Sequence, residues 1–288
     1  MSPIGEAGEK ARVLIEALPY IRRYRGETVV VKIGGAALDD PQLAAVVADD
    51  MALLTLVGLR VVVIHGGGPQ VSKAMEDAGL EPRFVGGLRV TDEAAMEIVS
   101  RVLVGSINVE LVARLQGTGL DAVGLSGIDG GLIEAEKATG EGGEDLGSVG
   151  RVVRVKPRVI NTLLDAGHTP VVASVASGVD GGPLNVNADA VAGAMAAELG
   201  AAKLVYLTNV EGLYRDLGDS GSLMSEIKRD DLSSMLPTFG TGMRPKAESA
   251  LKALDGGVAK VHILDGRVPH ALLLEIFTPD GIGTQVLA

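Results

Sequence analysis

The chain contains no cysteine and no tryptophan, and only 2% of its 288 residues are aromatic. The absence of cysteine excludes both a disulfide framework and a metal site built from thiolates. No apolar run reaches the ~18 residues that a membrane-spanning helix needs, and the first residues lack the basic and apolar regions of a signal peptide. We therefore expect a cytoplasmic protein without membrane contact, whose core is packed by aliphatic side chains.

The chain also lacks an excess of basic residues. Aspartate and glutamate number 37 against 26 lysines and arginines, which gives a formal net charge of -11. Because nucleic acid binds to basic surfaces, this balance argues against a nucleic-acid partner. An anionic small molecule would need local cations at its site. With 47% hydrophobic residues, the chain can form one large α/β domain or two lobes that share a sheet.

Short β-branched runs alternate with helical patterns along most of the chain. This alternation predicts a parallel sheet that is covered by helices on both faces. Strands are expected at residues 29–31, 60–64, 122–125, 169–173, 203–207 and 260–264, and helices at 41–57, 70–78, 93–117, 159–166, 189–199 and 242–254.

Three segments depart from this alternation. Residues 84–90 contain two short β runs around a glycine pair, which indicates a hairpin. The glycine- and glutamate-rich residues 138–150 are expected to form an exposed loop. Residues 9–24 carry apolar side chains at helical spacing, which predicts a helix ahead of the first strand. We place the boundary between two lobes near residues 175–185.

Glycine turns follow two of the expected strands. Lys32 and the pair Gly34–Gly35 end the first strand. Backbone N–H groups in such a turn can form an anion-binding nest, and a lysine adds a charge suited to phosphate, although a tight turn alone would also explain the glycines. His65 and the glycines 66–68 end the second strand ahead of a helix, whose positive end attracts anions. Three glycines exceed what a turn needs, which favours a ligand site, whereas His65 is expected to be structural.

Three further segments place polar groups beside turns or helix starts. Arg89 follows the expected hairpin, where it could hold a carboxylate through two hydrogen bonds or lie in solvent. Asn185, Asn187 and Asp189 alternate ahead of a helix, which needs only one of them as its N-cap. Lys246 lies at a helix start, where a cation is unfavourable unless an anion is present. Together, two lysines, an aspartate and two glycine turns suit phosphoryl transfer, which depends on positioning and on neutralising charge.

Seven segments carry a resemblance to a known family, in the family's order: HGGGPQ, GLRVTDEAAMEIV, GLSGIDGGLI, NVNADAVA, TNVEGLY, GMRPKAE and VHILDGRVPHALLLEIFT. Over residues 10–287 the chain resembles the amino acid kinase superfamily, and most closely its members that act on N-acetyl-L-glutamate. The resemblance implies an α/β fold, an open three-layer αβα sandwich with a mainly parallel central sheet. It also implies an oligomerisation helix at residues 1–25, an N-terminal lobe for amino acid binding and dimerisation at 26–180, and an ATP-binding C-terminal lobe at 181–288.

The activity implied by the resemblance is ATP-dependent phosphorylation of the γ-carboxylate of N-acetyl-L-glutamate to N-acetyl-L-glutamyl 5-phosphate, in arginine biosynthesis. Lys32 and Lys246 match lysines that stabilise the transition state, and Asp189 matches an aspartate that orients them. The residues that match the amino acid site are Gly67, Gly68, Arg89 and Asn185. Among them, Arg89 matches the residue that binds the substrate's α-carboxylate. The residues that match the site for ATP, which brings Mg²⁺, are Gly34, Gly35, Thr208, Asn209, Gly212, Leu213 and Gly240.

The N-terminal helix resembles the extension of arginine-inhibited members, which are hexamers built as trimers of dimers with interlaced helices. The resemblance implies L-arginine as a feedback inhibitor, and the matching residues are Tyr20, His270, Glu275 and Gly281. An exposed apolar helix stripe needs a partner in any case, although packing of the helix on its own domain would also supply one.

The chain departs from the family pattern at Ile33, Ala36, Ser106, Ile128 and Lys156, where other residues are usual. These departures leave open a related kinase with an aminoadipate-type substrate. A second alternative is a non-catalytic, arginine-binding regulatory paralogue, against which the intact lysine–aspartate–lysine set argues. A nicotinamide-dependent oxidoreductase would need a dinucleotide fingerprint, which the chain lacks.

Overall fold

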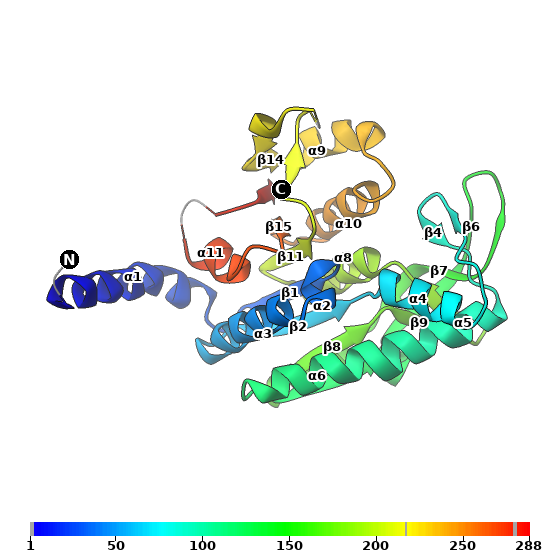
Figure 1. Ribbon diagram of the computed structural model, residues 1–288, viewed down its shortest axis with the longest axis horizontal. Coiled ribbons are helices and arrows are strands. Elements are labelled where there is room, and N and C mark those ends of the chain that lie inside the picture. Colours follow the sequence, from blue (N-terminus) through cyan, green and yellow to red (C-terminus); the bar gives the residue numbers. More distant parts are fainter. Residues whose placement is uncertain (1–2, 217, 279–280) are drawn as a thin grey trace.

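A central eight-stranded sheet organises the fold, in the order β14-β16-β15-β11-β1-β2-β8-β5 (Figure 1). The computed structural model describes residues 3–216, 218–278 and 281–288. Within these residues, the neighbouring strands of this sheet run parallel except for β15 and β16. The strands are β1 (Thr28–Ile33), β2 (Arg60–His65), β5 (Ala122–Ser126), β8 (Thr169–Ala173), β11 (Lys203–Thr208), β14 (Glu226–Lys228), β15 (Lys260–Asp265) and β16 (Thr284–Leu287).

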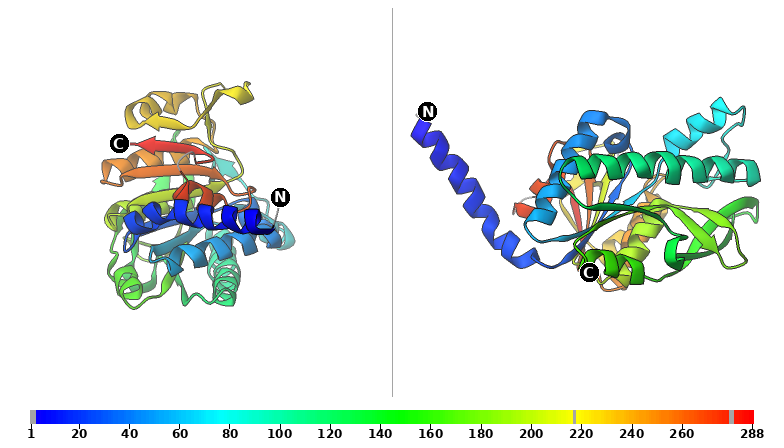
Figure 2. Two further views of the ribbon diagram at one scale, coloured as in Figure 1. Left: turned by 90° about the vertical axis from the view of Figure 1, so that its left-hand side faces the viewer. Right: turned by 90° about the horizontal axis from the view of Figure 1, so that it is seen from below.

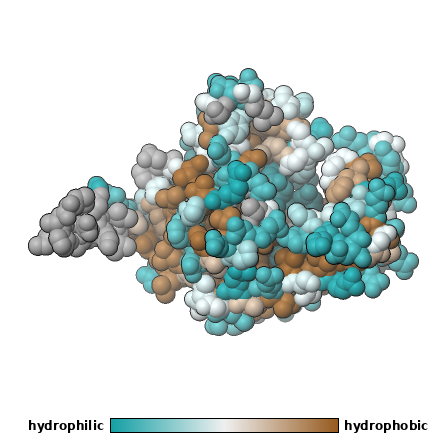
Figure 3. Space-filling view, viewed as in Figure 1, coloured by the Kyte–Doolittle hydropathy of each residue, from teal (hydrophilic) through white to brown (hydrophobic). Residues whose placement is uncertain are grey.

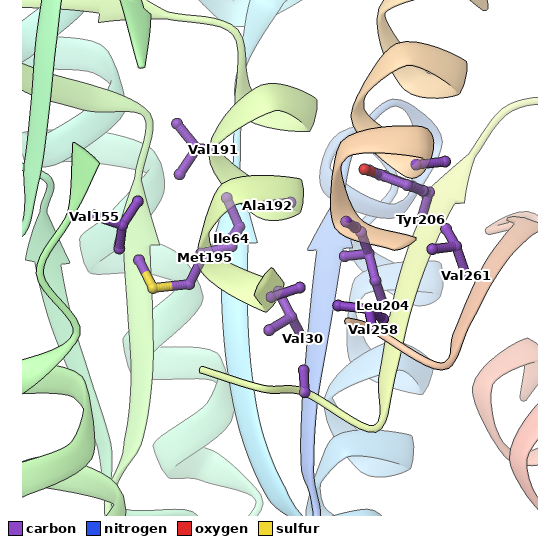
Figure 4. Close-up of a cluster of buried hydrophobic side chains, with 14 of the residues drawn as sticks. Val30, Ile64, Val155, Val191, Ala192, Met195, Leu204, Tyr206, Val258 and Val261 are labelled. Atoms are coloured by element: carbon purple, nitrogen blue, oxygen red, sulfur yellow. The ribbon is translucent and has the colours of Figure 1, made fainter. Parts of the chain in front are cut away.

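Alternate residues of the central strands face two different layers of helices, because successive side chains of a strand point to opposite sides. Val30 of β1 packs into one core with α7, α8 and α10, whereas Val29 and Val31 pack into a second core with α3, α6 and α11. Figure 4 shows part of the first core, with Val30 near residues of α8, and Figure 2 shows helices on both sides of the sheet. The predicted three-layer αβα fold is therefore confirmed. The helices of the two layers are α3 (Pro41–Leu56), α6 (Asn108–Gly117), α7 (Arg158–Asp165), α8 (Ala188–Glu198), α10 (Arg244–Asp255) and α11 (Ala271–Phe277).

Strand β1 lies where the strand order reverses. The chain up to Ala173 adds β2, β8 and β5 on one side of β1, and the chain from Lys203 onward adds β11 and β15 on the other. In open parallel sheets, ligands bind at the carboxyl ends of the strands beside such a reversal. Lys32 and Gly34–Gly35 lie at the carboxyl end of β1, and His65 with the glycines 66–68 lies at that of β2. The fold therefore brings both glycine turns to the same edge of the sheet.

A smaller sheet of β6, β7, β9 and β10 closes on itself. Figure 1 shows β6, β7 and β9 at the end of the molecule away from α1. Its strands are β6 (Ile133–Thr139), β7 (Asp145–Val155), β9 (Val175–Gly178) and β10 (Pro183–Val186). The expectation of an exposed loop at residues 138–150 was wrong, because the chain from Asp145 onward pairs with β6 and only residues 140–144 turn between the strands. Glycine there serves packing rather than a loop: a Cβ on Gly150 would lie only 2.9 Å from the Cβ of Leu184.

The predicted hairpin and long helix are both present. The hairpin consists of β3 (Phe84–Val85) and β4 (Leu88–Arg89). Asp92 then caps α5 (Glu93–Ser100) by accepting a hydrogen bond from the N–H of Ala95. Helix α5 continues through a π-helical stretch, Arg101–Ile107, into α6, so the helix predicted at 93–117 is confirmed. π-helical turns are rare and occur frequently at functional sites.

Helix α1 (Pro3–Tyr24) extends away from the body of the molecule (Figures 1 and 2). It begins before residue 9, the start expected from the sequence. Its residues Ile15 and Leu18 are 64% and 42% exposed, whereas Tyr24 at its end is buried. Figure 3 shows apolar side chains gathered on the body next to the base of α1. Among the helices of the described residues, none is long and apolar enough to cross a membrane.

The other α-helices and strands of the described residues lie between these elements. They are α2 (Ala36–Asp39), α4 (Gly68–Asp77), α9 (Arg229–Met235) and the two-stranded sheet of β12 (Leu213–Tyr214) and β13 (Leu223–Met224).

Candidate active site

Two lysines from distant parts of the chain contact one buried aspartate. Lys32 lies two residues after Val30 on β1, so its side chain points toward the layer of α8 and α10. Its Nζ lies 2.9 Å from Oδ1 of Asp189, in the first turn of α8. Nζ of Lys246, in the first turn of α10, lies 3.0 Å from Oδ2 of the same carboxylate. The structure therefore brings together the three residues that the sequence analysis proposed as catalytic.

The charges of the lysines control the state of Asp189. Burial alone would raise the pKa of this carboxyl group, but the two ammonium groups outweigh burial and lower its pKa. Asp189 is therefore an anion that bridges two cations, and it is not poised to exchange a proton near neutral pH. Each lysine retains donors that can turn to another anion.

Asn187 sets the start of helix α8. Its side-chain oxygen accepts hydrogen bonds from the N–H groups of Asp189 and Ala190, at 2.8 and 3.1 Å, so it is the N-cap. Asn185 has a different role: its amide donates to the hydroxyl of Thr91 at 3.1 Å, and that hydroxyl donates to the carbonyl of Arg89. Of the alternating polar residues, one caps the helix, one faces the β4 region, and Asp189 faces the lysines.

A second layer of hydrogen bonds lies behind Asp189. The hydroxyl of Tyr206, which is buried on β11, donates to Oγ of Ser249 at 2.7 Å, and Ser249 donates to the backbone carbonyl of Asp189. Ser249 belongs to α10, the helix that carries Lys246, and it packs so closely on Gly193 of α8 that a Cβ there would overlap it. Tyr206 and Ser249 therefore tie the start of α8 to β11 and to the middle of α10.

Both glycine turns admit a close approach that a larger residue would block. Gly35 has a φ of +58°, and a Cβ on it would overlap the side chain of Asn209. A Cβ on Gly67 would overlap Ile107 and Leu103 of the π-helical stretch. The glycines are therefore required by space and backbone conformation.

One cavity connects these features. It is lined by Lys32, Gly34, Gly35, Gly67, Gly68, Arg89, Asn185 and Asp189, among other residues. The proposed amino acid residues and the Lys32–Asp189 pair thus face the same space.

Arg89 is buried at one side of this cavity and has no acidic partner among the residues that the structure describes. Its guanidinium donates to the carbonyl of Gly68 and the hydroxyl of Ser72, both at 2.8 Å, and lies over the ring of Phe84. Burial lowers its pKa. Within the described residues no carboxylate lies within ion-pair distance of Arg89, and its Nε–H makes no hydrogen bond to them. A buried guanidinium in this state is suited to an incoming carboxylate.

The residues proposed for ATP lie at the carboxyl end of β11 and before α10. Thr208 ends β11, and Asn209 follows beside Gly35. The N–H of Leu213 donates to Oγ1 of Thr284 at 2.7 Å, which holds the Gly212–Leu213 segment against β16. Gly240 lies in the turn ahead of α10, where its carbonyl accepts from the N–H of Arg244 at 3.0 Å.

The arginine candidates fall into two groups. Tyr20, Glu275 and Gly281 line a second cavity, at the base of α1. His270 lies elsewhere: its Nδ1 is 2.6 Å from Oδ1 of Asp50 on α3. The structure therefore brings three of the four candidates together and leaves His270 apart.

Known proteins similar to this chain identify its family. The model of the amino acid kinase family matches residues 27–265. The chain belongs to the amino acid kinase family. An acetylglutamate kinase of Symbiobacterium thermophilum is 51% identical, over 98% of this chain and 99% of that protein. An acetylglutamate kinase of Frankia alni is 51% identical, over 96% of this chain and 82% of that protein.

Solved structures agree with this amino acid kinase assignment. The N-acetylglutamate synthase of Neisseria gonorrhoeae, complexed with coenzyme A and N-acetyl-glutamate, is 30% identical with a TM-score of 0.86. The match covers 96% of this chain and 63% of the synthase chain. The same synthase has also been solved with coenzyme A and L-arginine, where the identity is 28% and the TM-score 0.82.

Several residues at or near the amino acid kinase site escaped the sequence analysis. Ser72 holds Arg89, and Tyr206 with Ser249 supports Asp189, but a lone serine or tyrosine carries no distinguishing pattern. Lys203 lines the cavity at the base of α1, and His262 donates from Nδ1 to Glu275 at 2.6 Å. Charged or polar residues inside the apolar runs of β11 and β15 were the signal that could have found these two.

The departures from the family pattern do not line the central cavity where they are described. Ile33 is buried in the core with α3, α6 and α11, on the side of β1 away from Asp189. Ser106 and Ile128 are exposed, and Lys156 pairs with Glu134. The side chain of Ala36 lies outside the described ones.

Proposed function

We propose that this protein transfers the γ-phosphoryl group of ATP to the γ-carboxylate of N-acetyl-L-glutamate, which yields N-acetyl-L-glutamyl 5-phosphate and ADP, in arginine biosynthesis. The observation that carries the proposal is the bridge from Lys32 through Asp189 to Lys246 beside the cavity that Arg89 lines. The names of the relatives, acetylglutamate kinases at 51% identity, support the same substrate.

The chemistry needs cations more than it needs a base. The nucleophile is a carboxylate with an ordinary pKa of about 4.3, so it is already ionised at neutral pH. One of its oxygens forms a bond to the γ-phosphorus, the bond from that phosphorus to the bridging oxygen of ADP breaks, and no proton moves. The obstacle is repulsion between two anions. We assign Lys32 and Lys246 to offset that repulsion in the transition state.

Asp189 has an orienting role in this scheme. A carboxylate between two ammonium groups holds them at a fixed separation and offsets part of the cost of burying their charge. Tyr206 and Ser249 would in turn fix the backbone of Asp189.

The acceptor would be held mainly by the N-terminal lobe, residues 26–180, with Asn185 contributed from just beyond the lobe boundary. Arg89 would bind the α-carboxylate, and Asn185 with the N–H groups of Gly67 and Gly68 would complete the site. Because the described departures from the family pattern lie outside the cavity, we favour N-acetyl-L-glutamate over an aminoadipate-type substrate.

The nucleotide would be held mainly by the C-terminal lobe, residues 181–288, with the turn Gly34–Gly35 contributed by the N-terminal lobe. Gly34, Gly35 and the residues around Thr208, Leu213 and Gly240 would contact Mg·ATP, in which Mg²⁺ enters with the substrate. The glycine turn at Gly34–Gly35 would present backbone N–H groups to its phosphates.

We also propose that L-arginine inhibits the enzyme by binding in the cavity at the base of α1. Tyr20, Glu275 and Gly281 line that cavity together with Lys203, and we add His262, which contacts Glu275, in preference to His270. The exposed Ile15 and Leu18 on α1 favour interlacing with α1 of a second copy, in a cytoplasmic hexamer built as a trimer of dimers.

An acyl-phosphate assay tests the substrate and the regulation together. Hydroxylamine traps the acyl phosphate formed from N-acetyl-L-glutamate, L-glutamate or acetylaminoadipate, each with and without arginine. We expect product from N-acetyl-L-glutamate and its suppression by arginine. Product from acetylaminoadipate alone would overturn the substrate assignment, and arginine binding without any turnover would favour a regulatory paralogue.

Two variants test the lysines. Lys32→Ala and Lys246→Ala should each lower kcat by at least about tenfold with the fold intact. Near-wild-type turnover by either purified, folded variant would refute the catalytic assignment.

Deletion of residues 1–25 tests the oligomer. The truncated protein should be an active dimer that arginine no longer inhibits, as measured by light scattering and the same assay. A truncated protein that remains hexameric would contradict the interlaced helix.

A further inference from the structure

A buried hydrogen-bonded pair lies directly behind the second glycine turn. His65, at the end of β2, and Asn108, at the start of α6, are both buried. Nδ2 of Asn108 lies 3.0 Å from Nε2 of His65 and 3.0 Å from the carbonyl oxygen of Val171 on β8. Nδ1 of His65 lies 3.0 Å from the carbonyl oxygen of Gly66. The pair thus links the sheet and the long helix to the first residue of the turn.

This arrangement determines the tautomer of His65. A backbone carbonyl only accepts hydrogen bonds, so the group of Asn108 that faces Val171 is its NH₂. The same NH₂ donates to Nε2 of His65, which therefore carries no proton. The single proton of the neutral ring is on Nδ1 and is donated to the carbonyl of Gly66. Burial lowers the pKa of His65 to about 4, so the ring remains neutral at physiological pH.

The π-helical stretch places Asn108 and packs against the same turn. The N–H of Asn108 bonds to the carbonyl of Leu103, five residues earlier, and such a turn contains one more residue than an α-helical one. Leu103 and Ile107 of this stretch occupy the space that a Cβ on Gly67 would need, and Gly124 of β5 leaves room for the Asn108 side chain. The π-helical stretch therefore contacts the turn directly through Leu103 and Ile107. It is also linked to the turn indirectly, because Asn108 contacts His65 and His65 contacts Gly66.

The bond to Gly66 has a geometric consequence for Gly67. The described peptide bonds are trans, and a trans peptide directs its C=O and the following N–H in opposite directions. When His65 holds the carbonyl of Gly66 toward the interior, the N–H of Gly67 must point away from His65. Gly66, Gly67 and Gly68 all line the cavity, whereas His65 and Asn108 do not.

We propose that His65 and Asn108 are positioning residues, which fix the plane of the Gly66–Gly67 peptide so that the turn holds its N–H groups ready for the acceptor's carboxylate. The inference rests on the proposed function, in which Gly67 and Gly68 bind the amino acid. Donors that are fixed before the ligand arrives need no reorganisation during the reaction. His65 and Asn108 touch no reacting atom and act only through Gly66.

Kinetics of four full-length variants test this proposal. His65→Leu removes the donor to Gly66, and Asn108→Ala removes the group that fixes its tautomer. Each should reduce kcat/KM for N-acetyl-L-glutamate by about tenfold or more, as expected from a misplaced binding group, while KM for Mg·ATP stays within about twofold. His65→Asn offers an amide N–H near the position of Nδ1 and should recover most of the loss. Gln116→Ala is the matched control, because Gln116 also donates from the long helix to a carbonyl, that of Ala122, but far from the turn.

A spectroscopic measurement keeps the test independent of activity. In ¹⁵N-labelled full-length protein, His65 should show only the Nδ1–H tautomer between pH 6 and 8. Asn108→Ala should mix the tautomers and shift the amide signals of Gly67 and Gly68, and Gln116→Ala should change neither. Variants that lose only stability, with wild-type kinetics and amide signals in the folded fraction, would overturn the proposal. If the wild type does not phosphorylate N-acetyl-L-glutamate, the proposed function fails, and the amide signals alone then decide whether the pair positions the turn.

Discussion

Loss of the Asp189 carboxylate should destabilise the fold more than loss of Lys246. Asp189→Asn keeps the shape of the side chain but leaves the ammonium groups of Lys32 and Lys246, which are only 11% and 14% exposed, without their shared anion. At about 3 Å and an effective dielectric constant of about 20, each pair contributes about 5 kcal/mol of attraction before desolvation is counted. Removal of one partner from a buried pair typically costs about 3–5 kcal/mol, because the remaining charge is uncompensated. We expect a loss in this range.

Lys246→Met provides the matched comparison. In this variant Lys32 still neutralises Asp189 at 2.9 Å, so no buried charge is left alone, and we expect a loss of about 1 kcal/mol. The double variant Asp189→Asn/Lys246→Met leaves a single cation. It should be more stable than Asp189→Asn alone, because the two changes remove interacting charges and are not additive.

Urea unfolding followed by far-ultraviolet circular dichroism measures these differences, since the chain has no tryptophan for a fluorescence signal. The buffer must contain no phosphate. Added pyrophosphate should restore part of the stability of Asp189→Asn by supplying negative charge between the lysines. A free energy of unfolding for Asp189→Asn within about 0.5 kcal/mol of the wild type would refute this account of the carboxylate, and so would an equal loss in Lys246→Met.

Three further perturbations follow from the same contacts. Arg89→Lys should raise KM for N-acetyl-L-glutamate by about tenfold or more in steady-state kinetics and leave KM for Mg·ATP unchanged, since a lysine cannot form the paired hydrogen bonds of a guanidinium. Equal changes in both KM values would contradict the assignment of Arg89 to the acceptor. Gly67→Ala should lower the free energy of unfolding by about 1–3 kcal/mol in urea unfolding, because the added methyl group overpacks the site. A second change, Ile107→Val, removes the Cδ1 atom that this methyl group would overlap and should recover part of the loss. No recovery would show that backbone effects dominate. Burial lowers the pKa of Lys203 to about 8, so between pH 8 and 10.5 the unfolded chain binds a proton that the native protein does not. The free energy of unfolding must therefore rise with pH by up to about 3 kcal/mol relative to that of Lys203→Met. Parallel pH profiles of the two proteins would refute the depressed pKa.

The order of the main elements could be predicted from local sequence, because each depends on residues close in the chain. The β-branched runs from Val29 and Val61 form strands, and Asp92 caps its helix as the pattern indicates. The segment at residues 138–150 could not be predicted in this way. Its glycines resemble those of a loop, but Gly150 is needed where β7 passes Leu184, and that contact joins distant parts of the chain.

The site shows the same division. Its charged residues and glycines stood out because each is unusual for its position: a lysine ending an apolar strand, or three glycines where a turn needs fewer. The residues that support them, such as Ser72, Ser249 and Asn108, are ordinary polar side chains in sequence. Only the partner atom that each one meets gives it a role.

The sequence by itself determined the alternation of strands and helices, the lack of any disulfide, and the segments that carry the family resemblance, since these follow from composition and short-range pattern. Only the tertiary structure decided that Lys32 and Lys246, 214 positions apart in the printed chain, share one carboxylate, and that His262 rather than His270 lies beside Glu275. The physical reason is that ion pairs and buried hydrogen bonds depend on separations of a few ångströms, which strand order and helix packing establish between residues that are remote in sequence.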